Sequence, residues 1–230
     1  MKTCRSSLRF LADLASRLGR GALDEDDSSL CLAPGGCEVS GREQLIRRIL
    51  STIHNNSILL RGEPGTGKTA MLLHLKERLL TGGDPATDFF PVYIELHDVP
   101  ERLLFSTVAG AVFGQLAPMP ANRAASFGAD YGHRDLANDF RSVLSTLRKR
   151  STGQARLVLL IDGIDELNNY APRTAQRVRS LFMASLDGSL VMVASAVEIN
   201  KHWEQEGSPW YNFFEEIELP RVDHMKRHPG

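Results

Sequence analysis

One short glycine-rich string constrains this chain more than any other feature of its sequence. It follows a short apolar run at residues 57–60, opens a segment of helical periodicity, and reads Gly62-Glu63-Pro64-Gly65-Thr66-Gly67-Lys68-Thr69. This matches the spacing GxxxxGKS/T. Glycines allow the backbone to adopt positive φ and to turn its N–H groups inward, toward an anion held in front of a helix N-terminus. The sequence therefore predicts a strand, a phosphate-binding loop and a helix, in that order.

Each residue type in the loop has a chemical reason to be there. Lys68 would reach the β- and γ-phosphates as a point charge, and the Thr69 hydroxyl would be one ligand of magnesium. We expect a nucleoside triphosphate, ATP with magnesium, to be bound by Gly62, Glu63, Pro64, Gly65, Thr66, Gly67, Lys68, Thr69 and Ala70. A glycine-rich turn that meets a helix by chance is the alternative, and the order of strand, loop and helix argues against it.

A second string carries acidic residues at the end of an apolar run. Residues 157–161 are Leu-Val-Leu-Leu-Ile, and Asp162, Asp165 and Glu166 follow them. This is the pattern of a Walker B motif: Asp162 at the strand tip would hold magnesium through its water, and Glu166 or Asp165 would orient the attacking water. The choice between these two stays open. Alternatively, the acids solvate the turn and cap the next helix.

Apolar runs alternate with helical periodicity along the rest of the chain, which is typical of α/β architecture. Strands are expected at residues 57–60, 91–96, 156–161, 190–194 and 214–219. Helices are expected from residue 68 and at 102–115, 135–150 and 173–186. The run at 156–161 is almost continuously apolar, as in a parallel strand buried on both faces. Residues 117–133, rich in Ala, Gly and Pro, are expected to form a loop.

Composition shifts suggest three parts: residues 1–38 as a helix (6–18) and an acidic linker (24–29), residues 39–220 as the main domain, and residues 221–230 as a polar tail. The leading helix resembles a transit peptide, but Asp13 weakens that interpretation. No apolar run approaches the roughly 20 residues that cross a bilayer, so we expect no membrane association. The three cysteines, Cys4, Cys31 and Cys37, lack zinc-site spacing, and reduced thiols in a cytoplasmic protein are expected.

Charge gives little reason to expect nucleic acid as a partner. The formal net charge is -1, with 24% charged residues, so any such contact would need a local basic patch. Two short clusters exist, Arg148-Lys149-Arg150 and Lys226-Arg227-His228. The first falls at an expected helix C-terminus, where the macrodipole favours cations without any partner. Nucleic acid is therefore a disfavoured partner.

Together with Gly41-Arg42-Glu43, the two strings resemble those of the STAND and origin-recognition branch of AAA+ P-loop ATPases. The Asp-Gly-hydrophobic-Asp-Glu arrangement is similar to the NACHT group. The resemblance covers residues 39–220. It implies a three-layer α/β/α sandwich with a parallel sheet in the order 5-1-4-3-2, and nucleotide at the carboxyl ends of the first and third strands.

The resemblance also assigns residues outside the two strings. Val39 and Arg42 would lie beside the adenine, although Ser40 with Glu43 also has the spacing of a helix-capping box. Ser195 would be a polar sensor near the γ-phosphate, but Ala196 stands where many relatives have arginine. Ser208 to Asn212 looks like a segment of prokaryotic STAND-like ATPases, with aromatics more typical of a core.

Family members continue into a helical lid. From the resemblance we expect this lid to be missing here, with residues 221–230 as the start of a truncated one. Without a lid, closure over the nucleotide is in doubt. An arginine finger is not identifiable from the sequence. Arg173, Arg177 and Arg179 could project toward a neighbouring site, but a solvated helix face is the ordinary interpretation.

These features lead to one principal functional hypothesis and two alternatives. The chain would be an ATPase that uses binding and slow hydrolysis as a regulatory switch, read by a protein partner or by self-association. Lys68 would neutralise charge on the phosphates while Glu166 or Asp165 aligns water. The first alternative is a nucleotide-binding scaffold with little turnover. The second, a P-loop small-molecule kinase, is disfavoured by the Asp-Gly-Ile-Asp-Glu string.

Overall fold

The structure, a computed structural model, describes residues 38–54, 56–82, 84, 86–116, 127, 130–183 and 188–220. The chain divides into two compact units, Met1–Gly41 and Arg42–Gly230. The fold described below is that of the second unit. The cysteines, the helix predicted at residues 6–18, the linker at 24–29, and the tail at 221–230 with its basic cluster lie outside the described residues, as does most of the loop predicted at 117–133.

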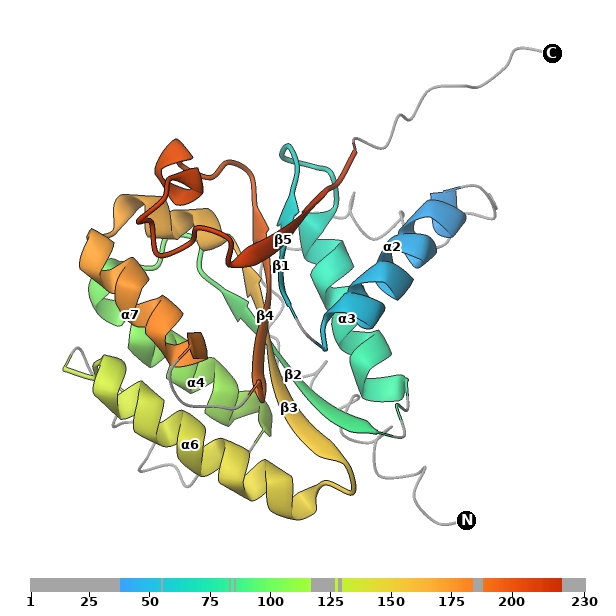
Figure 1. Cartoon of the computed structure of the whole chain (residues 1–230), viewed down its shortest axis with the longest axis horizontal. Helices are drawn as coiled ribbons and strands as arrows, with labels where there is room; N and C mark the ends of the chain where they lie inside the picture. Colours follow the sequence, from blue (N-terminus) through green and yellow to red (C-terminus); the bar gives the residue numbers. More distant parts are fainter. Residues whose placement is uncertain are drawn as a thin grey trace, which may run out of the picture. The chain divides into compact units, whose positions relative to one another are not determined.

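Within the described residues, five parallel strands form one sheet (Figure 1). They are β1 (Ser57–Arg61), β2 (Thr87–Glu95), β3 (Gln154–Asp162), β4 (Leu190–Ala196) and β5 (Phe214–Glu218). Their spatial order is β2-β3-β4-β1-β5. Read from the other edge, this is 5-1-4-3-2, so the expected sheet order is confirmed.

Helices connect the strands and cover both faces of the sheet, because parallel strands need crossover connections. The helices are α2 (Glu38–Thr52), α3 (Lys68–Thr81), α4 (Leu104–Leu116), α6 (His133–Arg150) and α7 (Pro172–Met183). Short 3-10 turns are η2 (Glu101–Leu103), η3 (Ile164–Asn169) and η4 (Lys201–Glu204). The residues of α2 from Arg42 onward pack with α3 on one face, and α4, α6 and α7 cover the other (Figure 1). The predicted three-layer α/β/α arrangement is thus confirmed.

The two faces of β3 enter two separate cores. Successive side chains of a strand point to opposite faces. Leu157, Leu159 and Ile161 accordingly pack with α4, α6 and α7, whereas Val158 and Leu160 pack with α2 and α3. Every residue of β3 after Gln154 is buried. This is why the strand is an unbroken apolar run in the sequence.

The second strand begins earlier than predicted. We expected it at residues 91–96, from the apolar run that begins at Pro91. The observed strand starts at Thr87, and Pro91 lies inside it, paired in register with Val158. Because β2 is at the edge of the sheet, a residue without an N–H is tolerated there.

The capping box considered for Ser40 and Glu43 is wrong. Helix α2 begins at Glu38, so Ser40 lies inside the helix and not at its N-cap. The Glu43 carboxylate instead lies 3.2 Å from Nη2 of Arg78 on α3 and 3.8 Å from Nε of Arg47. Glu43 therefore joins α2 to α3 and caps no helix.

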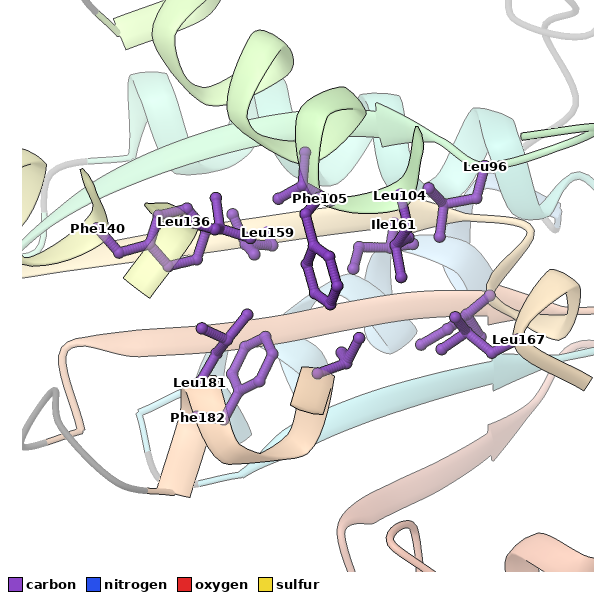
Figure 2. Close-up of a pocket in the computed structure, with 13 residues that line it drawn as sticks. Leu96, Leu104, Phe105, Leu136, Phe140, Leu159, Ile161, Leu167, Leu181 and Phe182 are labelled. Atoms are coloured by element: carbon purple, nitrogen blue, oxygen red, sulfur yellow. The ribbon is translucent and has the colours of Figure 1, made fainter. Parts of the chain in front are cut away.

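The core beneath α4, α6 and α7 contains a small apolar void (Figure 2). Its volume is about 20 Å³, and it is lined by Leu96, Leu104, Phe105, Val108, Leu136, Phe140, Leu159, Ile161, Ile164, Leu167, Val178, Leu181 and Phe182. A single water would just fit, but a buried water needs two to four polar partners and this wall offers apolar side chains. The void is a feature of core packing and no ligand site.

Truncation of a side chain at this void should cost more than truncation at the surface. Phe140 is 1% exposed, and Phe140→Ala should lower the free energy of unfolding by about 3–5 kcal/mol, because the residual cavity adds to the lost burial. Leu80→Ala, at a residue 59% exposed on α3, should change it by less than about 0.5 kcal/mol. Urea denaturation of both variants measures the difference. Equal effects would show that the core does not lie under α6.

Candidate functional site

The loop between β1 and α3 has the backbone that its glycines predict. Gly65 and Gly67 have φ of 79° and 80°, in the left-handed region that side-chain-bearing residues rarely adopt. Gly67 is the N-cap of α3. A Cβ at Gly67 would lie 2.7 Å from Nη2 of Arg42, so the guanidinium would have to shift to admit one. The loop therefore turns sharply and leads directly into the helix N-terminus.

Arg42 holds this loop from outside. Its Nη2 donates a hydrogen bond to the Thr66 carbonyl at 3.2 Å. Thr66 is 2% exposed, and its hydroxyl donates to the Glu63 carbonyl at 3.0 Å. Arg42, assigned by the resemblance to the adenine side, is thus observed against the loop backbone. The side chain of Val39 is not among those described.

Lys68 lies inside the bend, with 9% of its surface exposed. Its Nζ donates to the carbonyls of Gly62 at 2.7 Å and Glu63 at 2.9 Å. Burial lowers the pKa of Lys68, and the charges of Asp162 and Asp165 oppose that shift. An ammonium has three N–H donors. The loop carbonyls use two of them, and the third can meet a phosphate oxygen.

The Asp162 carboxylate is the point where the two motifs meet. It is 3% exposed and accepts three hydroxyl hydrogen bonds. The Thr69 hydroxyl donates to Oδ2 at 2.6 Å, the Tyr93 hydroxyl donates to Oδ2 at 2.9 Å, and the Ser195 hydroxyl donates to Oδ1. These donors come from α3, β2 and β4. Elements far apart in the sequence therefore converge on one oxygen pair at the carboxyl end of β3.

Ser195 is bonded on both sides. It is 1% exposed, accepts a hydrogen bond from the Gly163 N–H at 3.2 Å, and donates its own proton to Asp162. A serine hydroxyl has a single O–H to donate. In this arrangement the Ser195 hydroxyl donates to the carboxylate of Asp162, although the resemblance assigns Ser195 to the γ-phosphate.

Asp165 and Glu166 have different surroundings. Oδ2 of Asp165 accepts from the Val197 N–H at 3.1 Å, whereas its Oδ1 is buried and has no hydrogen-bond partner among the described residues. Glu166 accepts from the Asp98 N–H at 3.2 Å through Oε1 and from Asn169 at 3.5 Å through Oε2. Asp165 also acts electrostatically on Lys68. Both oxygens of Glu166 thus accept hydrogen bonds from the surrounding turns, whereas only one oxygen of Asp165 does so among the described residues.

Tyr93 lies at the site, but no sequence motif predicted it there. A lone tyrosine inside a strand is ordinary, and only its place near the carboxyl end of β2 could have suggested a contact. Burial raises the pKa of its phenol, and the charge of Asp162 and the hydrogen bond to it raise that pKa further. The phenol therefore stays a donor at physiological pH.

The backbone of Tyr93 is held by a glutamine. Its N–H donates to Oε1 of Gln115 at 3.0 Å, and its carbonyl accepts from Nε2 of Gln115 at 2.7 Å. Lys76 on α3 donates to the same Oε1 at 2.7 Å. The amide of Gln115 thus bonds to the edge of β2 in the way a neighbouring strand would.

The remaining candidates have various surroundings. Trp210 is 4% exposed and stacks on Trp203, whereas Tyr211 is 40% exposed. Arg179 donates to the Pro209 carbonyl and lies 5.6 Å from the ring centre of Phe213, so it packs on its own chain. Arg173 and Arg177 are exposed. The cluster Arg148, Lys149 and Arg150 forms the last turn of α6, as predicted.

The arrangement can hold a polyphosphate and a hard cation. A hydroxyl and a carboxylate offer the oxygen ligands that magnesium prefers, and the loop offers N–H groups at a helix N-terminus. Within the described part of the chain, no group of three or more His, Cys, Asp or Glu side chains could hold a metal. No helix of that part is long and apolar enough to cross a bilayer.

Known proteins share this sequence pattern and this fold. A family model described as AAA ATPase domain matches residues 38–193. Chaperone protein ClpB of Bacteroides thetaiotaomicron is 32% identical over 133 residues, which are 56% of this chain and 12% of ClpB. The Walker-type ATPase of Pyrococcus abyssi has a TM-score of 0.56 at 16% identity, covering 80% of this chain and 54% of that one. Cdc6p from Pyrobaculum aerophilum has a TM-score of 0.51 at 20% identity, covering 86% and 49%. The two structural likenesses show the fold, and the chain spans only a small part of ClpB.

The turn after Asp162 should be sensitive to a methyl group. Gly163 has φ of 75°, and a Cβ there would lie 2.6 Å from the His97 ring. Gly207 has φ of 98°, and no described atom lies within 4 Å of such a Cβ. Gly207→Ala should lower the free energy of unfolding by about 1–2 kcal/mol for the backbone alone. Gly163→Ala should lower it further, because His97 must also move.

Chemical denaturation measures both variants, and Gly163→Ala combined with His97→Ala isolates the contact. In the His97→Ala background, Gly163→Ala should lower the free energy of unfolding only by as much as Gly207→Ala does. Equal effects of the two single glycine variants would mean that His97 does not pack on this turn.

Proposed function

This chain belongs to the AAA ATPase domain family, and we propose that it binds ATP with magnesium at residues 62–69 and hydrolyses the bond between the β- and γ-phosphates. One observation carries the proposal. The Thr69 hydroxyl lies 2.6 Å from Oδ2 of the buried Asp162, so the first residues of α3 and the tip of β3 already form one oxygen-rich site. The sequence distance between them makes a chance juxtaposition a poor explanation.

The residues present fit magnesium. In nucleotide sites this ion is held by one or two carboxylates and by phosphate oxygens, and it keeps several waters. Asp162 and Thr69 supply the protein's share. Magnesium held by these two residues would supply positive charge to offset the negative charge that develops on the phosphates. Lys68, with its third N–H unused by the loop, adds a fixed positive charge on the same side.

We assign the orientation of the attacking water to Asp165. Its Oδ1 is buried without a partner among the described residues, and a buried oxygen of this kind is costly unless a ligand or a water satisfies it. The two oxygens of Glu166 accept from Asp98 and Asn169. Glu166 then fixes the turn after β2 relative to η3 and acts indirectly.

The finer role that we propose is a nucleotide-dependent switch of the STAND or NACHT-like kind. Support comes from the bond between Oδ2 of Asp165 and the Val197 N–H, which begins the segment that carries Trp203 and Trp210. A movement of Asp165 on hydrolysis would shift that segment, and a partner bound to the segment would respond to the shift. The Ser195 hydroxyl donates its single proton to Asp162 and so has none to donate to the γ-phosphate, which agrees with slow turnover. A scaffold with little turnover is the alternative.

Three substitutions separate binding from turnover. Lys68→Ala should weaken ATP binding by about 30-fold or more, because a buried charge contact with the phosphates is lost. Asp165→Asn should leave the affinity within a few-fold and lower the hydrolysis rate by about 10²-fold or more. Glu166→Gln should lower that rate much less. Calorimetric titration with ATP, ADP and GTP, with and without magnesium, measures affinity, and phosphate release measures turnover.

Retained hydrolysis in the variant that lacks both Asp165 and Glu166 carboxylates would defeat this mechanism. A larger loss in Glu166→Gln than in Asp165→Asn would reverse the assignment of the two acids. Transfer of phosphate to an added small molecule in place of water would indicate a kinase.

The concentration of the protein should distinguish the switch from the scaffold. If a second copy or a partner completes the site, phosphate release per molecule should rise with protein concentration, and the mass of the ATP complex should exceed that of the ADP complex. Rates that stay at the level of Lys68→Ala at every concentration would favour the scaffold. Measurements of phosphate release and of light scattering on the same samples decide between them.

A further inference from the structure

We propose that Tyr93 is a positioning residue of the nucleotide site, whose hydroxyl fixes the Asp162 carboxylate in the orientation that meets magnesium. This inference rests on the proposed function and goes beyond it. Tyr93 comes from β2, on the side of β3 away from the phosphate loop in the sheet order. Its hydroxyl donates to Oδ2 of Asp162 at 2.9 Å.

The hydrogen bonds of Asp162 give the physical reason. An ionised carboxylate has about four acceptor positions, two on each oxygen. Thr69 and Tyr93 donate to Oδ2, and Ser195 donates to Oδ1. Three positions are thus filled by hydroxyls, and the remaining one lies on Oδ1. A metal-bound water can meet the carboxylate there without displacing a hydroxyl.

Removal of the Tyr93 hydroxyl would open a second position. Oδ2 would keep Thr69 alone, and the carboxylate could rotate about its Cβ–Cγ bond toward Thr69 or Lys68. The groups that orient a metal-binding carboxylate matter nearly as much as the carboxylate itself. The hydroxyl of Tyr93 is the part of this arrangement that comes from the neighbouring strand.

The position of Tyr93 is itself fixed through a closed ring of contacts. Gln115 accepts from the N–H of Tyr93 and donates to its carbonyl, and Lys76 donates to Gln115. Lys76 lies on α3, seven residues and two turns after Thr69. Thr69, Asp162, Tyr93, Gln115 and Lys76 therefore connect two positions on α3, two turns apart, through β3, β2 and α4.

Tyr93→Phe tests the inference, because it removes one oxygen and keeps the ring. The wild type should bind ADP more tightly with magnesium than with EDTA. In Tyr93→Phe the affinity in EDTA should be unchanged, and the affinity in magnesium should fall by about 10-fold, the usual cost of losing an outer contact to a metal site. Isothermal titration calorimetry under the two conditions measures both values without any turnover.

Tyr170→Phe is the matched control. Its hydroxyl is also partly buried and donates to the Val99 carbonyl, away from Asp162. Both variants should lower the melting temperature by similar amounts, but only Tyr93→Phe should lose affinity in magnesium. A magnesium effect in Tyr93→Phe within twofold of wild type would overturn the inference and leave the proposed function standing. If the wild type shows no magnesium effect, both fail together.

Discussion

The buried charge of Asp162 is the constraint on which the site depends. A carboxylate that is 3% exposed would be costly without hydrogen-bond donors around it. Here the donors are hydroxyls from α3, β2 and β4. The N-terminus of α3 and the carboxyl-terminal parts of β2 and β4 must lie beside the end of β3 for the oxygens to meet. The electrostatic requirement of one side chain thus brings three neighbouring elements together at the carboxyl edge of the sheet, where parallel sheets usually hold their ligands.

Local rules explain how much the sequence could foretell. Glycine spacing before Lys68 predicted the left-handed φ values of Gly65 and Gly67, because few other residues adopt them. The unbroken apolar run of β3 predicted burial on both faces, and it is observed. The sheet order came from resemblance to a family and was confirmed. All of these depend on residues that are close together in the chain or on motifs with fixed spacing.

Contacts across the sheet could not be foretold in this way. Tyr93 meets Asp162 only because β2 pairs with β3 in one register, with Glu95 opposite Asp162. The different surroundings of Asp165 and Glu166 depend on backbone N–H groups at Val197 and Asp98, from two loops that no spacing rule connects. Arg42 was assigned a place by analogy and packs on the loop. Such partners are set by the tertiary fold and leave no periodic trace in the sequence.

The glutamine at the rim of the sheet has a consequence for solubility as well. An outer strand exposes unpaired N–H and C=O groups, which invite another polypeptide to add a strand and begin fibrillar growth. At Tyr93 the amide of Gln115 already fills both. At the opposite rim, β5 carries Glu215, Glu216 and Glu218, and charged side chains on an outer strand disfavour the addition of another strand. The two rims are thus protected by different means, one by an amide that takes the place of a neighbouring strand and one by charged side chains.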